Sequence, residues 1–208
     1  MLYGDIMKEK IFEYINEYQK IIKVILICII LGILTGNIIF GLLNDGLKNE
    51  FVSGFKNTLE LVKNSGFQDV NMIKNGIISN AILIFIIYFC SITLLAPVLI
   101  GSIAFFKSCA IGLYFPIIFS IFGFSKGILV TLLLLILPNL IYLPSFIFLN
   151  VNAIHFHYEL FENDDRARIM IVLKEIVKIG IAFSFVILSV VLEQILTNIV
   201  LNIYLNLG

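Results

Sequence analysis

Long stretches of this chain carry almost no charged residues, and each approaches the ~20 residues that a helix needs to cross the ~30 Å hydrocarbon core of a bilayer. Hydrophobic residues make up 60% of the chain and charged residues 13%, against about 45–50% and about 25% in soluble domains. Lipid offers the backbone no hydrogen bonds, so only helices and closed β-barrels span it. The apolar runs lack the alternation of barrel strands. We therefore predict an all-α fold, a polytopic transmembrane helical bundle.

Short polar segments divide the apolar sequence into about five spans. We expect these spans at 21–43, 77–106, 108–124, 128–150 and 179–202. The other segments are an amphipathic N-terminus at 1–20, an amphipathic loop at 44–76, a charged amphipathic segment at 151–178 and a C-terminus at 203–208.

The distribution of basic residues predicts the orientation in the cell membrane. Of the 14 Lys and Arg residues, nine fall on the side of the N-terminus and five on the other side. Cytoplasmic loops carry the excess of Lys and Arg in membrane proteins. We therefore place the N-terminus and 151–178 in the cytoplasm, and the 44–76 loop and the C-terminus outside.

Lys107 leaves two divisions of the second and third spans open. In the first, the helix at 77–106 ends before Lys107, whose ammonium reaches the cytoplasmic surface. In the second, Pro97 marks the turn and Lys107 lies at depth. An unpaired lysine at the bilayer centre costs about 2.5–3.5 kcal/mol, which favours the first division.

Glycines and prolines inside the spans indicate close helix packing. Gly32 and Gly36 form a GxxxG pair, which lets a second helix approach closely; the alternative is the ordinary tolerance of glycine in membrane helices. Pro138 and Pro144 lie in the fourth span, where each removes a backbone hydrogen bond. Because neighbouring helices must satisfy the freed carbonyls, we predict a kinked fourth span packed inside the bundle.

Apolar residues recur every three to four positions in the 44–76 loop, which predicts an amphipathic helix. These residues are Phe51, Phe55, Leu59 and Val62. A helix of this kind lies on the membrane surface or docks a partner. We assign the four residues as partner-docking anchors.

The sequence gives little support for catalysis. HExxH and P-loop motifs are absent, and a chain with zero net charge lacks the basic surface that binds nucleic acid. On a strand, His155 and His157 would share a face and bind a metal with Glu159 or Glu162. On a helix they diverge, and we interpret them as interfacial histidines. We predict no enzyme, no cofactor and no metal site.

Glu193 is an ionisable residue within the fifth span. A charge at that depth must face a cavity or a partner. Glu193 therefore relays protons or binds a cation in one interpretation, and hydrogen-bonds a neighbouring helix or lies near the outer interface in the other.

A recognisable pattern runs from 105 to 154. Phenylalanine and lysine precede a small-xxx-glycine step, a glycine-containing turn follows at 123–127, and a proline–asparagine run with a second proline lies in the next span. The residues that carry this pattern are Lys107, Ser108, Gly112, Pro138, Asn139 and Pro144. The pattern resembles the stage II sporulation protein M family, whose five-span layout and long loop after the first span are also similar. Two features depart from that family. Ser108 stands where the family has glycine, and Pro138 and Asn139 are adjacent.

The resemblance implies a membrane scaffold rather than an enzyme. Members of that family hold a lytic transglycosylase and an amidase/endopeptidase at the septal and engulfing membrane during endospore formation. The resemblance therefore implies the same membrane-anchored partners and the sporulation septum for this chain. The small residues Gly32, Gly36, Ser108 and Gly112 would pack span against span, or bind the anchor helix of a partner.

A small transporter or channel is the competing hypothesis. Its support is the proline-broken fourth span, which contains Asn139, together with Glu193 in the fifth span. Broken helices and buried carboxylates build the midplane sites of transporters. A third hypothesis, an intramembrane hydrolase, requires His155 or His157 at depth beside Glu159.

Overall fold

The computed structural model describes residues 13–65, 70–162 and 165–205, and all regular structure in these ranges is helical. After a short helical segment at 13–17, the elements are α2 (Gln19–Leu42), α3 (Asp45–Ser65), α4 (Val70–Ser91), α5 (Ala96–Thr131), the π-helical turn η2 (Leu132–Ile136), α6 (Leu137–Glu162) and α7 (Asp165–Leu205). The predicted all-α fold is confirmed. Most of the N-terminal segment at 1–20 and the last residues of 203–208 lie outside the described residues.

Within the described residues, four helices are long and apolar enough to cross a membrane. They are Gln19–Leu42, Ile73–Ser91, the continuous helical stretch Ala96–Glu162, and Arg168–Thr197. Large apolar side chains remain exposed along them, as at Ile38, Phe85 and Phe106. A soluble monomer rarely exposes so much contiguous apolar surface, so these helices indicate a membrane protein.

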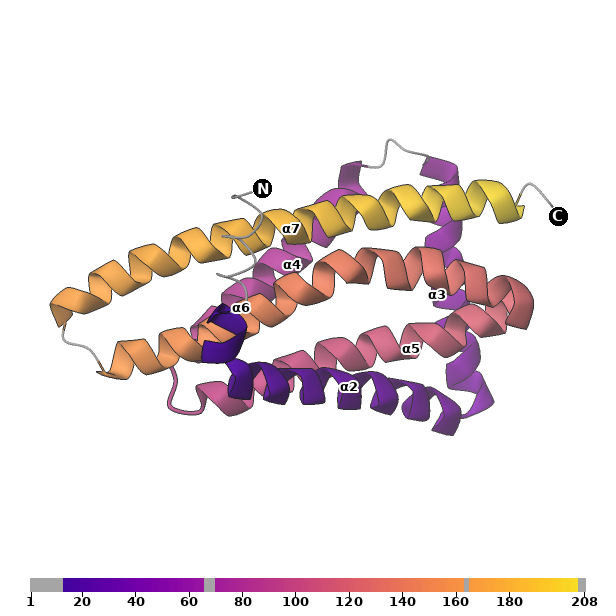
Figure 1. Ribbon diagram of the computed structural model, residues 1–208. Helices are drawn as coiled ribbons and strands as arrows, with labels where there is room; N and C mark the ends of the chain where they lie inside the picture. Colours follow the sequence, from indigo (N-terminus) through magenta and orange to yellow (C-terminus); the bar gives the residue numbers. More distant parts are fainter. Residues whose placement is uncertain (1–12, 66–69, 163–164, 206–208) are drawn as a thin grey trace.

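The stretch Ala96–Glu162 folds back on itself at Gly123. Gly123 has φ 70° and ψ 177°, a conformation that glycine adopts without steric cost. The rings of Phe119 and Phe124 stack across this turn, with centroids 5.9 Å apart, and Gly127 leaves room for the Phe119 side chain. The chain therefore reverses in the polar segment that separates the predicted third and fourth spans, as Figure 1 shows at the end of α5.

The structure contradicts the predicted helix at 77–106. α4 ends at Ser91 and α5 begins at Ala96, with Pro97 in its first turn. Proline fits that turn because the N–H that it lacks would have no partner there. Lys107 lies inside α5, so the less favoured division of the sequence is the one that the fold adopts. The predicted boundary between 77–106 and 108–124 is wrong because it assumed that Lys107 has no partner.

The charged segment predicted at 151–178 is not a separate unit. Its first part continues α6 to Glu162, and its second part begins α7 at Asp165. The predicted irregularity of the fourth span takes the form of the π-turn η2, which ends just before Pro138. Proline cannot donate to the preceding turn, and a π-turn is a common way for a helix to absorb such a defect.

α2 and α5 pack backbone to backbone through the small residues predicted for helix packing. A Cβ atom on Gly32 would overlap the carbonyl of Phe105, one on Gly36 would overlap the carbonyl of Cys109, and one on Gly112 would overlap the carbonyl of Ile33. Ser108 is fully buried in the same contact. These four residues are therefore used within the chain, as small-xxx-small steps permit.

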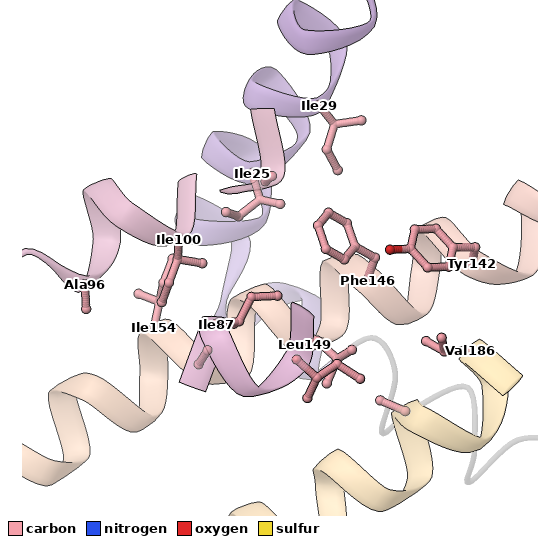
Figure 2. Packing of buried hydrophobic residues seen from close by; sticks show 14 residues of the cluster. Ile25, Ile29, Ile87, Ala96, Ile100, Tyr142, Phe146, Leu149, Ile154 and Val186 are labelled. Atoms are coloured by element: carbon pink, nitrogen blue, oxygen red, sulfur yellow. The ribbon is translucent and has the colours of Figure 1, made fainter. Parts of the chain in front are cut away.

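A hydrophobic core joins all the long helices except α3. Figure 2 shows side chains from α2, α4, α5, α6 and α7 gathered around Phe146 of α6. The labelled residues include Ile25, Ile87, Ile100, Phe146, Leu149 and Val186. α3 instead crosses the bundle near the end where α5 turns back (Figure 1), and it contacts α5 and α7.

A buried carboxylate ties α4 to α7. Glu175 of α7 is 2% exposed, and its Oε1 accepts a hydrogen bond of 2.8 Å from the Tyr88 hydroxyl of α4. Lys178 lies 3.0 Å from the other carboxylate oxygen. α4 is the least enclosed of the candidate spans, and this contact adds a polar attachment to its apolar packing.

We expect Tyr88→Phe to lower the melting temperature of the purified protein by several degrees. The change removes a hydrogen bond to a charged group, worth about 1.5–3 kcal/mol, and a loss of that size shifts melting by several degrees. Tyr158→Phe is the matched control, because Tyr158 is half-exposed and the structure gives its hydroxyl no hydrogen bond within the described residues. Equal melting temperatures of the two variants in detergent would show that the Tyr88–Glu175 contact contributes nothing.

Candidate ligand cavity

One cavity of ≈ 420 Å³ lies among α3, α4, α5, η2, α6 and α7. Its volume falls in the range of small-molecule sites, about 300–1,000 Å³. Apolar side chains form part of the wall, including Phe55, Leu59, Ile111 and Leu134. The polar part consists of Thr58, Asn80, Lys107, Tyr114, Asn139, Tyr142, Ser189, Glu193, Gln194 and Thr197.

Lys107 reaches the cavity from α5 and lies against an aromatic ring of α6. Its Nζ is 5.5 Å from the centroid of the Tyr142 ring, within the range of a cation–π interaction. The Tyr142 ring is 8% exposed and stacks on Phe146 with centroids 5.5 Å apart. Phe146 therefore holds the ring that partly compensates the lysine charge.

Glu193 reaches the same cavity from α7. The Lys107 ammonium and the Glu193 carboxylate attract each other electrostatically. Among the described residues, however, the direct ion pairs are His155–Glu159 and Lys178–Glu175. Lys107 and Glu193 thus face one space without forming a direct pair.

The irregular backbone before α6 forms another part of the wall. Asn139 donates from Nδ2 to the Leu135 carbonyl at 2.6 Å, and Ser189 of α7 donates to the Pro138 carbonyl at 3.0 Å. Both side chains thus donate to backbone carbonyls beside the irregular turn. The bond from Ser189 also fixes α7 against α6 beside the cavity.

Several of the sequence-predicted residues come together here. Lys107, Pro138, Asn139 and Glu193 all line the cavity, although they come from three different helices. Pro144 lies inside α6, is exposed, and is not part of the lining. Lys107, Pro138 and Asn139, which carry the resemblance, therefore belong to one site together with the Glu193 carboxylate.

The structure corrects the assignment of Phe55 and Leu59 as docking anchors. Leu59 is 7% exposed and lines the cavity with Phe55, whose ring lies 5.7 Å from that of Tyr114. The apolar stripe of α3 covers the bundle, so these two side chains are not available to a partner. Phe51 is 44% exposed, and the side chain of Val62 lies outside the described residues.

The two histidines make different contacts on α6. His157 is buried, and its Nδ1 lies 2.9 Å from the Ser91 carbonyl at the end of α4. His155 lies 3.6 Å from Glu159 and packs against the Tyr18 ring. Within the described residues, no group of three His, Cys, Asp or Glu side chains is placed to hold a metal ion. His157 is therefore part of the packing between α4 and α6.

Further polar residues line the site without having been predicted from the sequence, among them Asn80, Tyr114, Tyr142, Ser189 and Thr197. Asn80 is a polar residue within an apolar run, which is a usable signal for a cavity wall. Tyrosine, serine and threonine are common in membrane helices, so the other four carry no such signal without the fold.

Comparison of the chain with protein families, with curated proteins and with solved structures gives no match.

Proposed function

We propose that this chain is a multi-pass membrane scaffold of the stage II sporulation protein M type, which holds peptidoglycan-degrading enzymes at the septal and engulfing membrane. The observation that supports this proposal is the convergence of Lys107, Pro138 and Asn139 on one cavity. They lie in the two separate segments that carry the resemblance. Residues that form one site are a more specific likeness than the apolar composition of membrane helices.

The proposal includes five membrane crossings. The reversal at Gly123 divides the stretch Ala96–Glu162 into two arms. At 1.5 Å per residue, each arm is long enough to cross the hydrocarbon core. With α2, α4 and α7 the crossings number five, so the termini lie on opposite sides, the N-terminus in the cytoplasm and α3 outside.

The proposed docking surface for the enzymes is the outward face of α3 near its start. Leu47 and Phe51 are both exposed, and their i, i+4 spacing places them on one face of the helix. This surface replaces the predicted anchors Phe55 and Leu59, which pack inward. An exposed aromatic–aliphatic pair suits a helix or extended segment of a lytic transglycosylase or an amidase/endopeptidase.

We expect Phe51→Asp to abolish co-purification of these enzymes from spore-forming cells while membrane insertion is kept. The introduced aspartate carboxylate would be desolvated and unpaired in this apolar contact. The affinity for the enzymes therefore falls by at least about tenfold. Lys56→Glu, at an exposed position of the same helix, is the control. Recovery of the enzymes with Phe51→Asp at the level of this control would exclude the α3 surface.

A transporter or channel is the second candidate function, and the cavity is the observation that favours it. Opposite charges and the irregular backbone beside Pro138 line one polar space among the spans, as in transporter sites.

The two functions differ in what Glu193→Gln does. A transporter loses solute uptake by the reconstituted protein because its cavity charge is gone, and it keeps its partners. A scaffold keeps its co-purifying enzymes, and the reconstituted protein shows no uptake that depends on Glu193. Parallel uptake and co-purification measurements on this one variant decide between them.

A further inference from the structure

Two opposite charges on one cavity wall need a partner that satisfies both. The Lys107 ammonium and the Glu193 carboxylate attract each other but form no direct ion pair within the described part of the chain. Each of these charges is stabilised by a group of opposite charge beside it. A ligand that carries charges of both signs compensates both side chains.

The polar side chains of the wall present acceptors to the cavity. Asn80 donates to the Gly76 carbonyl at 2.9 Å, Ser189 donates to the Pro138 carbonyl at 3.0 Å, and Thr197 donates to the Glu193 carbonyl at 2.7 Å. The hydroxyl hydrogens of Ser189 and Thr197 and one of the two amide N–H groups of Asn80 are thus used inside the protein. The Asn80 Oδ1 atom is buried and has no hydrogen-bond partner among the described residues.

A primary ammonium is the group that matches this set of acceptors. It carries three N–H donors and no acceptor, so it can bond Glu193 and neutral oxygens such as that of Asn80 together. A quaternary ammonium has no N–H donor and leaves those oxygens unsatisfied. Near Lys107 the complementary group is an anion, and lysine binds phosphate as a point charge.

We propose that the cavity binds a phosphoethanolamine group, with its phosphate beside Lys107 and its primary ammonium beside Glu193. The group reaches the cavity either as the head of phosphatidylethanolamine from the bilayer or as the free solute. The volume of ≈ 420 Å³ accommodates it, and Ile111 and Leu135 provide an apolar wall for the adjoining carbons. This inference goes beyond both functions proposed above and depends on neither.

The lipid source is tested by native mass spectrometry of the full-length protein in detergent, with phosphatidylethanolamine, phosphatidylcholine and phosphatidylglycerol added in equal amounts. We expect phosphatidylethanolamine to be retained about tenfold over phosphatidylcholine, a ratio that corresponds to about 1.4 kcal/mol. The free source is tested by thermal unfolding with phosphoethanolamine, inorganic phosphate or ethanolamine. Specific binding raises the melting temperature by a few degrees, and only phosphoethanolamine should do so.

The variants Lys107→Gln and Glu193→Gln should each remove the preference. Lys23→Gln and Glu60→Gln, which remove exposed charges away from the cavity, should keep it. The melting temperature of each variant without ligand shows whether it is folded. The charge-exchanged variant Lys107→Glu/Glu193→Lys keeps both charges on the wall and should regain part of the preference.

Each outcome decides the proposal. Preference for phosphatidylethanolamine that depends on both side chains supports the lipid source, and stabilisation by phosphoethanolamine without lipid retention supports the free solute. Equal retention of the three lipids with no stabilisation by phosphoethanolamine overturns the proposal. Equal retention of phosphatidylglycerol and phosphatidylethanolamine, unaffected by Glu193→Gln, also overturns it, because the site then recognises an anion alone.

Discussion

Gly36→Leu will separate α2 from α5 and remove most of the folded protein. A Cβ atom at Gly36 overlaps the backbone carbonyl of Cys109, and a backbone atom in the middle of α5 cannot move aside as a flexible side chain can. Overpacking costs about 1–3 kcal/mol where side chains can adjust. We expect the cost here to reach or exceed the upper end of that range, a large share of the ~5–15 kcal/mol that stabilises a typical domain.

The same helix provides the control. A Cβ atom at Gly41 of α2 meets nothing within 4 Å, so Gly41→Leu adds the same side chain without the clash. Size-exclusion chromatography and thermal unfolding in detergent should show a loss of monodisperse protein for Gly36→Leu only. Two equally stable variants would mean that α2 and α5 are not in backbone contact.

The second large effect is the electrostatic coupling between Lys107 and Glu193 across the cavity. Lys107→Gln leaves the Glu193 carboxylate without the cation that attracts it. Removing one member of a fully buried pair costs about 3–5 kcal/mol. We expect about 1–2 kcal/mol here, because Glu193 is open to the cavity and solvent there screens the interaction. Glu193→Gln should destabilise the protein by a similar amount.

The double variant Lys107→Gln/Glu193→Gln should be more stable than the sum of the single effects predicts. Replacing both charges removes the unpaired partner, which is often neutral for stability. A double-mutant cycle of unfolding free energies measures this coupling directly. Additive effects would show that the two charges act independently and that the cavity does not bring them together.

Local patterns in the sequence predict the parts of this fold that depend on one helix at a time. Gly32 and Gly36 mark a helix face that allows close approach whatever the partner is, and the structure places α5 against it. The glycine-containing turn at 123–127 and the helical character of 51–62 follow in the same way from spacing and backbone preference.

The parts that depend on distant residues could not be predicted in this way. The period of Phe51, Phe55 and Leu59 shows that α3 has an apolar stripe, but it does not show whether the stripe faces a partner or the protein's own bundle. The sequence predicts Lys107 at a helix end because no partner for its charge lies nearby in the chain. Its partners, Tyr142 and Glu193, come from α6 and α7, and only the fold brings them to α5.

The central claim, a membrane scaffold for wall-degrading enzymes, is tested most directly by purifying this protein in mild detergent from spore-forming cells and identifying the proteins that accompany it by mass spectrometry. An unrelated multi-pass protein, expressed and purified in parallel, is the control. We expect enrichment of a lytic transglycosylase and an amidase/endopeptidase with this chain over the control. Folded, monodisperse protein that carries neither enzyme above the control level would contradict the scaffold and leave the Lys107–Glu193 cavity as the centre of its function.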